Sequence, residues 1–466
     1  MNKIIKYIKE NKIIIVMTLI FFLIRLPYLD QLNLLHDERD ISLSGYSISK
    51  TGKDLSGNFL PLTVTNIAPD NPITSIYYSA AAWLFTSQKN VFNARFPYVL
   101  ISSLLIFLIY KLILIITKNR PLSYLTSLFC CFSPWLFHIT RLGMDVTLAF
   151  PTLLIAILFQ LKNKKIFSFI FYTLTFYNYQ GFRPLIPVLI VFFTLVANQK
   201  KIILRALFIN IIFIVALFTS SFLIDRNVTQ ARVTQVIFFN KILLDSKIVF
   251  NRNTSSASSL VKAVFDNKIT ESGNYILSAF IKGIDNTFLF KDGDYSAING
   301  SISGGQFLIP TILFFYFGFI AFGRKFNRYD LVVLSFIPLG MIPSVLSTNG
   351  ISFGIRGVFS SIGFSFVIAR GFSLFYEVIS KMQNIKFKNA IIVLVLISYM
   401  FGVLNFVYIY FFRRPILMGE IFNEHERKVS QFLMVNQGVT SRYVYTNNKE
   451  SLERSFLFFN KFHSII

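Results

Sequence analysis

Blocks of apolar residues, each about 17 to 23 residues long, recur along most of this 466-residue chain. A helix of that length can cross a hydrocarbon core about 30 Å thick. Only 15% of the residues are charged and 54% are hydrophobic, whereas a soluble protein typically carries about 25% charged residues. The sequence therefore predicts an all-α polytopic membrane protein and excludes a soluble multidomain protein.

The apolar blocks predict about eleven membrane-spanning helices. They are expected near 12–29, 95–116, 121–139, 144–161, 166–180, 185–198, 202–223, 307–322, 331–347, 357–376 and 390–412. The aromatic-rich segment 72–88 is expected to be an interfacial helix, because counting it as a span would turn the later basic loops outward. This map gives a membrane domain at 1–412, with long outward loops at 30–94 and 224–306, and a short outward-facing tail at 413–466.

The net charge of +24 comes largely from clusters of lysine and arginine between apolar blocks, at 3–12, 162–165, 200–205 and 324–328. Such short basic loops are typical of the cytoplasmic side of a membrane. They place the N-terminus in the cytoplasm and the C-terminus outside, and they argue against a nucleic-acid partner. The abundance of Lys, Ile, Asn and Phe favours an AT-rich bacterial genome, and hence the bacterial cytoplasmic membrane and an undecaprenyl carrier.

The first outward loop contains the acidic sequence His36-Asp37-Glu38-Arg39-Asp40. Paired carboxylates at a membrane surface can serve as a general base, as metal ligands or as both. The simpler alternative is a solvated loop with an Arg39 ion pair. Consecutive side chains diverge on a helix, so these residues alone make a poor metal site. The sequence predicts no metal ligands and leaves a divalent cation open.

Four arginines are predicted on the face opposite the lysine clusters: Arg95, Arg141, Arg183 and Arg356. A single arginine there is often a membrane anchor whose charged end reaches the headgroups. Four together suggest a binding site for an anion, because a guanidinium group can form two parallel hydrogen bonds to a phosphate. A lipid phosphate at the outer boundary of the membrane is the expected ligand.

Carboxylates and arginines on one membrane face suit a sugar transfer from a lipid phosphate. A carboxylate would deprotonate an acceptor hydroxyl, and the arginines would stabilise the leaving phosphate. A single displacement of this kind inverts the sugar. Tyr77, Tyr78, Tyr177 and Tyr179 could line a sugar or lipid groove, although interfacial anchoring is the ordinary role of such residues.

Short motifs spread along the chain then resemble a known family. They are Asp37-Glu38, Thr51-Gly-Lys-Asp-Leu-Ser-Gly-Asn58 with Pro61, Ala94-Arg-Phe-Pro97, Ser133-Pro-Trp135, Arg141-Leu-Gly143 with Asp145, Tyr177-Asn-Tyr-Gln180 with Arg183-Pro184, Gly293-Asp294, Gly304-Gly305 and Gly354-Ile-Arg-Gly357. In this order, over about residues 20 to 412, they resemble the membrane glycosyltransferases of the GT-C fold. The nearest branch is glycosyltransferase family 39 and its neighbours, related to protein O-mannosyltransferases and lipid A aminoarabinose transferases.

The resemblance implies a polyprenyl-phosphate sugar donor, an acceptor glycan, lipid or protein, and an active site at the outer face of the membrane. It implies that Asp37 is the catalytic base and that Glu38 orients it or the acceptor. The remaining expected site residues are Arg95, Arg141, Arg183 and Arg356 for the donor phosphate, and Tyr77, Tyr179, Asp54 and Asp145 for the substrate groove. The sugar and the acceptor stay open.

Three other readings compete with this transferase. A glycan polymerase or ligase that uses a lipid-diphosphate donor would have a similar topology. A lipid flippase or transporter is disfavoured, because the predicted spans are nearly free of acids and, apart from Arg370, the charges gather at one face. A non-catalytic assembly factor on the same fold would be indifferent to the loss of Asp37.

Overall fold

The computed structural model describes residues 2–64, 72–197, 203–224, 226–294, 296, 298, 300, 304–348, 353–435 and 444–460. Within these residues the chain is a bundle of helices, with β structure limited to isolated bridges such as Lys53 with Phe59. The predicted all-α fold is therefore confirmed.

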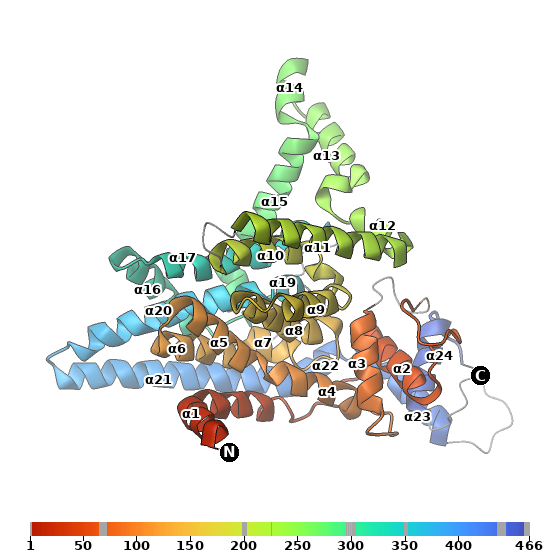
Figure 1. Ribbon diagram of the computed structural model, residues 1–466, viewed down its shortest axis with the longest axis horizontal. Coiled ribbons are helices and arrows are strands. Elements are labelled where there is room, and N and C mark those ends of the chain that lie inside the picture. The colour runs from red at the N-terminus through yellow and green to blue at the C-terminus, as the bar shows by residue number, and fades with distance from the viewer. Residues whose placement is uncertain are drawn as a thin grey trace.

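Apolar helices of different lengths lie side by side in the body of the molecule (Figure 1). They are α1 (Asn2–Leu23), α4 (Val91–Ser103), α5 (Leu105–Thr117), α6 (Arg120–Cys131), α7 (Pro134–Ile139), α8 (Asp145–Leu161), α9 (Lys165–Phe176), α10 (Leu185–Ala197), α11 (Ile203–Ile224), α16 (Thr311–Arg324), α17 (Arg328–Leu334), α18 (Phe336–Val345), α19 (Phe353–Arg356), α20 (Ser360–Ser380) and α21 (Ile385–Tyr408). Within the described residues, five stretches are long and apolar enough to cross a membrane: Val91–Thr117, Ile203–Ile224, Arg328–Val345, Ser360–Ser380 and Ile385–Met418.

Some predicted spans are interrupted. The span expected at 121–139 is divided into α6 and α7, with Phe132 and Ser133 between them. The break has a local cause, because Pro134 disfavours helical geometry at the residue before it and has no N–H to donate. The span expected at 331–347 is likewise divided into α17 and α18 at Ser335.

The first outward loop contains two helices, α2 (His36–Thr51) and α3 (Ile73–Trp83). The eleven residues of α3 extend about 16 Å, which is too short to cross a membrane. The two helices pack closely: a Cβ added at Gly45 would lie 2.7 Å from the Ser79 Cβ. The Trp83 indole also donates a 3.0 Å hydrogen bond to the Ser42 carbonyl. This packing fixes the direction of α2.

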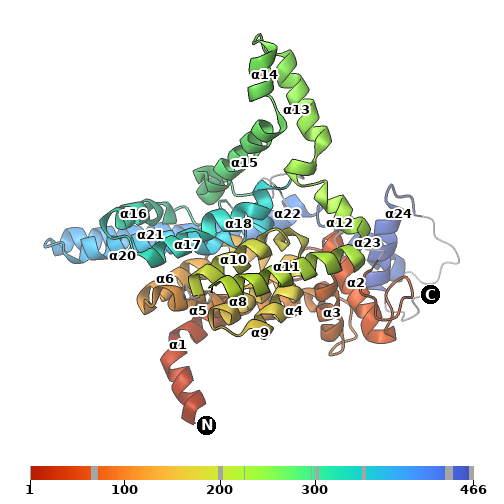
Figure 2. The same ribbon diagram turned by 45° about the horizontal axis from the view of Figure 1, so that its top comes forward.

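The segment predicted as the second outward loop, at 224–306, is largely helical where it is described. It contains α12 (Arg226–Val233), α13 (Lys241–Asn253), α14 (Ser259–Phe265) and α15 (Lys268–Ile284), followed by a π-helical turn (Thr287–Lys291). In both views α13, α14 and α15 project from the body (Figures 1 and 2), while α12 stays near α11. Short 3-10 turns (Gln180–Phe182 and Ile237–Phe239) occur close to the base of this projection.

The C-terminal tail is also helical where it is described. A π-helical turn (Ile409–Arg413) continues α21 into α22 (Arg414–Met418), which is followed by α23 (Glu424–Val435) and α24 (Lys449–Phe459). The last two helices lie beside α2 (Figures 1 and 2). They are held there by buried ion pairs from Arg39 to Glu426, at 2.9 Å, and from Arg454 to Asp40. The tail therefore packs on the first outward loop.

Candidate functional site

A cavity of about 950 Å³ opens beside the N-terminal end of α2. Its polar and aromatic lining comes from Asp37, Asp145, Tyr179, Gln180, Arg183, Thr229, Arg232, Gln235, Ser296, Ser347 and Arg356. Its apolar lining includes Met144, Pro184, Phe218, Val233, Val236, Phe238, Phe239, Pro343, Leu346 and Ile355. A cavity lined by both charged and apolar side chains suits an amphipathic ligand.

Asp37 is the second residue of α2 and is partly buried in this cavity. Its carboxylate forms no hydrogen bond or ion pair with any residue that the structure describes. Burial, followed by the negative charge of Asp40, raises the pKa of Asp37, whereas Arg232 lowers it to a smaller extent. An uncommitted carboxylate with a raised pKa can act as a general base.

Glu38 is the next residue, but it points away from the cavity and is only 1% exposed. Arg95 donates to both of its oxygens, at 2.9 and 2.7 Å. The Gly143 amide donates to Oε1 at 2.6 Å, and the Leu35 amide donates to Oε2 at 2.9 Å. These four bonds fully engage the carboxylate. They join the start of α2 to α4 and to the loop that precedes Asp145.

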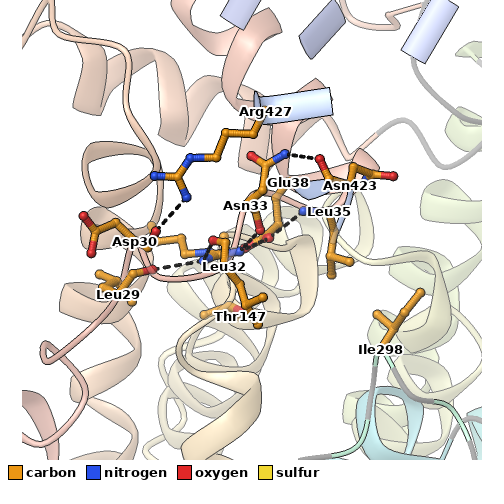
Figure 3. Close-up of polar contacts among 12 residues, drawn as sticks. Leu29, Asp30, Leu32, Asn33, Leu35, Glu38, Thr147, Ile298, Asn423 and Arg427 are labelled. Atoms are coloured by element: carbon orange, nitrogen blue, oxygen red, sulfur yellow. Dashed lines mark hydrogen bonds and ion pairs between the residues drawn. The ribbon is translucent and has the colours of Figure 1, made fainter. Parts of the chain in front are cut away.

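The loop before α2 is anchored to the C-terminal segment (Figure 3). The Asn33 side-chain amide donates to the Asn423 carbonyl at 2.9 Å, and Arg427 donates to the Asp30 carbonyl at 3.0 Å. Figure 3 also shows Leu35 bonded to Glu38 at the first turn of α2. These contacts hold Asp37 in a fixed position relative to the cavity.

Asp145 and Tyr179 enter the same cavity from other parts of the chain. Asp145 begins α8, and its Oδ1 accepts a 2.7 Å hydrogen bond from the Val146 amide. The Asn178 amide donates to the Asp145 carbonyl at 2.8 Å, which ties the two loops together. Tyr179 interacts through its side chain with Arg356. The cavity therefore joins two acids to an aromatic residue.

Two of the four predicted arginines also line the cavity. Arg183 donates to the Ser221 hydroxyl at 3.1 Å and lies over the Phe176 ring. Arg356 ends α19 and donates to the Ser347 hydroxyl. Arg183 also donates to the Phe176 carbonyl at 3.3 Å, and both guanidinium groups line the cavity. They are placed to bind an anion in the cavity.

Asp294 fixes the segment that carries Arg356. Its two oxygens accept hydrogen bonds from the Ser296 amide at 2.9 Å and the Gly354 amide at 2.6 Å. Burial raises the pKa of Asp294 to about 6, although these bonds oppose the rise. The Gly293-Asp294 and Gly354-Ile-Arg-Gly357 motifs, which are distant in the sequence, therefore meet through one carboxylate.

Arg232 is a cavity residue that the sequence analysis did not identify. It lies on α12, donates to the Gln235 side chain at 2.6 Å and has a favourable electrostatic interaction with Asp37. Burial lowers the pKa of Arg232. No sequence signal singles it out, because the long loop that contains it also holds many other lysines and arginines.

The other predicted site residues lie elsewhere. Arg95 and Arg141 line a separate small pocket, described below, and Glu38 is buried against Arg95. Asp54 accepts hydrogen bonds from the Ser56 and Asn58 amides, so it shapes its own loop. The Tyr77 hydroxyl, whose pKa is raised by burial, donates to the Pro61 carbonyl. The structure thus brings together Asp37, Asp145, Tyr179, Arg183 and Arg356.

Over the described ranges, no group of three or more His, Cys, Asp or Glu side chains is arranged to hold a metal ion. Asp37 and Asp145 alone provide fewer ligands than Ca²⁺ or Zn²⁺ normally take from a protein. The cavity chemistry is therefore described through the side chains.

Two solved structures resemble the chain over nearly its whole length. The archaeal oligosaccharyltransferase AglB from Archaeoglobus fulgidus, in complex with an inhibitory peptide and a dolichol-phosphate, has a TM-score of 0.52 at 11% identity. The match covers 97% of this chain and 64% of AglB. ArnT from Cupriavidus metallidurans, bound to undecaprenyl phosphate, has a TM-score of 0.52 at 12% identity, with 96% of this chain and 85% of ArnT covered. No protein-family model and no curated protein matches the sequence.

The shared architecture defines the class of this chain by its fold. It is a multi-pass membrane protein with the fold of the GT-C membrane glycosyltransferases, as the sequence resemblance predicts. At 11 to 13% identity the likeness concerns the fold, so the reaction has to be argued from the cavity.

Proposed function

We propose that this protein is an inverting glycosyltransferase that moves a sugar from a polyprenyl-phosphate donor to an acceptor hydroxyl. One observation carries the proposal: the uncommitted carboxylate of Asp37 shares a cavity with Arg183, Arg232 and Arg356 and with an apolar wall. The arginines suit the phosphate of the donor, and the apolar wall suits the first part of its lipid chain. AglB and ArnT have been solved with dolichol-phosphate and undecaprenyl phosphate, which belong to the same class of ligand.

In the proposed reaction, Asp37 accepts the proton of the acceptor hydroxyl while the hydroxyl oxygen attacks the anomeric carbon. The bond between that carbon and the phosphate oxygen breaks, and its electron pair stays on the polyprenyl phosphate. Guanidinium groups stabilise this additional negative charge. Because bond formation and bond breaking occur on opposite faces of the sugar, the anomeric configuration is inverted.

We place the cavity at the outer face of the cytoplasmic membrane. The basic connection between α16 and α17, with Arg324, Lys325 and Arg328, lies at one end of the bundle, and α2 and α24 lie at the other (Figures 1 and 2). Under the positive-inside bias, the basic end is cytoplasmic. This orientation puts the N-terminus inside and α23 and α24 outside.

The proposal is tested with the full chain in lipid nanodiscs. The protein is incubated with a panel of undecaprenyl-phosphate sugars and a membrane extract that supplies acceptors, and each donor is followed by mass spectrometry. We expect one donor to be converted to undecaprenyl phosphate and the transferred sugar to have the opposite anomeric configuration. Retention of configuration, or survival of every donor in the panel, would contradict the proposal.

A second candidate has one observation in its favour. Arg183, Arg232 and Arg356 place three guanidinium groups in the cavity, which would also suit a diphosphate. Undecaprenyl-diphosphate sugars therefore belong in the same panel. Consumption of a diphosphate donor in place of every monophosphate donor would assign the protein as a lipid-diphosphate-dependent polymerase or ligase.

A further inference from the structure

A second pocket lies on the other side of Glu38 from the large cavity. It has a volume of about 20 Å³ and is lined by Tyr28, Leu29, Gln31, Leu32, Arg95, Arg141, Leu142, Tyr410, Phe411, Arg414, Pro415 and Phe422. We call it the arginine pocket. It shares no lining residue with the large cavity. Its volume admits one or two oxygen-sized atoms.

Four guanidinium groups are buried in and around the arginine pocket. The residues Arg25, Arg95, Arg141 and Arg414 are 0, 4, 6 and 4% exposed. Among the residues that the structure describes, Arg25, Arg141 and Arg414 form no ion pair, and Glu38 pairs with Arg95. Burying a cation without a counter-ion is costly. The cluster therefore calls for additional negative charge.

The four arginines differ in how their N–H groups are used. Arg95 makes five hydrogen bonds, two to Glu38 and three to the carbonyls of Leu29, Leu32 and Asn33. This fills its donor capacity.

Arg141 is partly satisfied. It donates to the carbonyls of Arg25 and Tyr28, at 2.6 and 3.0 Å. Its guanidinium also lies 5.1 Å from the centre of the Phe411 ring. Burial lowers the pKa of Arg141 to about 10, so the group stays charged at neutral pH.

Arg25 and Arg414 keep buried donors without a partner among the described residues: Nη2 of Arg25, which lies outside the pocket lining, and two nitrogens of Arg414. The two nitrogens of Arg414 are Nε and Nη2. The rings of Tyr410 and Phe422, with centroids 5.0 and 4.9 Å away, hold the Arg414 guanidinium in place. A rigid, buried and unsatisfied guanidinium lining a small pocket is a preformed donor for an oxyanion.

We infer that the arginine pocket takes one or two oxygens of a phosphate group, with Arg414 as their main donor. The ligand is either free inorganic phosphate or the exposed headgroup of a phosphomonoester lipid. This site is separate from the donor site proposed above, since the two share no lining residue.

The test measures phosphate binding to the full chain in detergent by equilibrium dialysis with radiolabelled inorganic phosphate, in chloride buffer of constant ionic strength. We expect saturable binding of one phosphate and a matching rise in Tm. Dodecyl phosphate, in a parallel competition, identifies the source: displacement by it at lower concentration than by inorganic phosphate assigns a lipid headgroup. An absence of saturable binding of both compounds would overturn the inference.

The variant Arg414→Met removes the unsatisfied guanidinium while keeping an unbranched side chain in its place. We expect it to weaken phosphate binding about tenfold or more, the scale for losing a charge-assisted hydrogen bond. Arg413→Met, at the exposed neighbouring position, is the matched control and should bind normally. Loss of binding in Arg356→Met with retention in Arg414→Met would move the phosphate to the large cavity and overturn the inference.

The wild-type measurement stays informative if Arg414→Met does not fold, because a Tm that rises equally with chloride and with phosphate also contradicts the site. Arg414→Lys provides a second variant. Lysine keeps the charge but lacks the planar fork, so it should fold and bind phosphate more weakly than the wild type.

Discussion

The large cavity and the arginine pocket lie on either side of two consecutive acids, yet they differ in almost every physical respect. On the cavity side, Asp37 is partly exposed and uncommitted. On the other side, Glu38 is buried and accepts four hydrogen bonds. The two neighbouring carboxylates therefore differ in role. Glu38 fixes the backbone at the start of α2, and that backbone positions the Asp37 carboxylate in the cavity.

The largest expected effect is on stability, on the Glu38 side. Glu38→Gln leaves the buried Arg95 without its counter-ion, and removing one partner of a buried ion pair typically costs about 3–5 kcal/mol. We expect a marked fall in Tm in detergent. Glu38→Gln combined with Arg95→Met should recover much of the loss, since no unpaired charge remains. A single variant as stable as the wild type would remove the structural role of Glu38.

The next effect is on turnover, on the cavity side. Asp37→Asn should lower sugar transfer about 10²-fold or more, the usual scale for a general base, while the Tm stays near that of the wild type. Asp30→Asn, an exposed acid in the same loop, is the matched control and should transfer normally. Equal loss in both variants, or normal transfer by Asp37→Asn, would contradict a base at this position.

The arginines offer a finer comparison. Arg356→Lys should weaken donor use about tenfold, because lysine cannot fork around a phosphate in the large cavity. Arg141→Lys should leave the donor KM nearly unchanged and lower the Tm, because Arg141 bonds to carbonyls outside that cavity. Donor KM values that rise equally in both variants would show that the two pockets are not independent.

The smallest expected effect is a shift in pH dependence. Transfer requires ionised Asp37, so activity should rise with pH through the pKa of Asp37, which burial and Asp40 raise above its ordinary value. Asp40→Asn removes the negative charge of Asp40. The pKa of Asp37 should then fall, and the rising limb should move toward lower pH. A rising limb that moves toward higher pH in this variant would show that Asp40 does not act on Asp37 through its charge.

Periodicity and charge predicted most of the architecture, because long apolar blocks and basic loops are local properties of a sequence. The interfacial segment 72–88 does contain a short helix, α3, at Ile73–Trp83. The broken helices were not predicted: α17 and α18 divide at Ser335, close to Pro338, which has no N–H to donate to the Leu334 carbonyl four residues earlier. The projecting helices α13–α15 lie in a segment that the sequence analysis treated as an outward loop.

The candidate site was predicted in part. Asp37, Asp145, Tyr179, Arg183 and Arg356 could be proposed because unusual residues on one membrane face narrow the choice. The sequence does not show which arginines line the large cavity and which line the arginine pocket, since this depends on contacts across the bundle.

Two buried arginines in and around the arginine pocket, Arg25 and Arg414, were missed by the sequence analysis for different reasons. Arg25 lies within a long apolar block, and a single charged residue changes the mean hydropathy of such a block very little. Arg414 follows the last apolar block, in a segment read as a polar tail. Both are nevertheless among the most buried polar residues that the structure describes.

The packing of α24 on α2 has a consequence for biogenesis. Arg39 donates to the backbone of Ser451, 412 residues further along the chain. During synthesis, α2, which carries the proposed base Asp37, is therefore made long before the helix that supports it has been translated. A nascent chain halted before that point would hold its acid on an unbraced helix, so transfer activity should emerge late in translation.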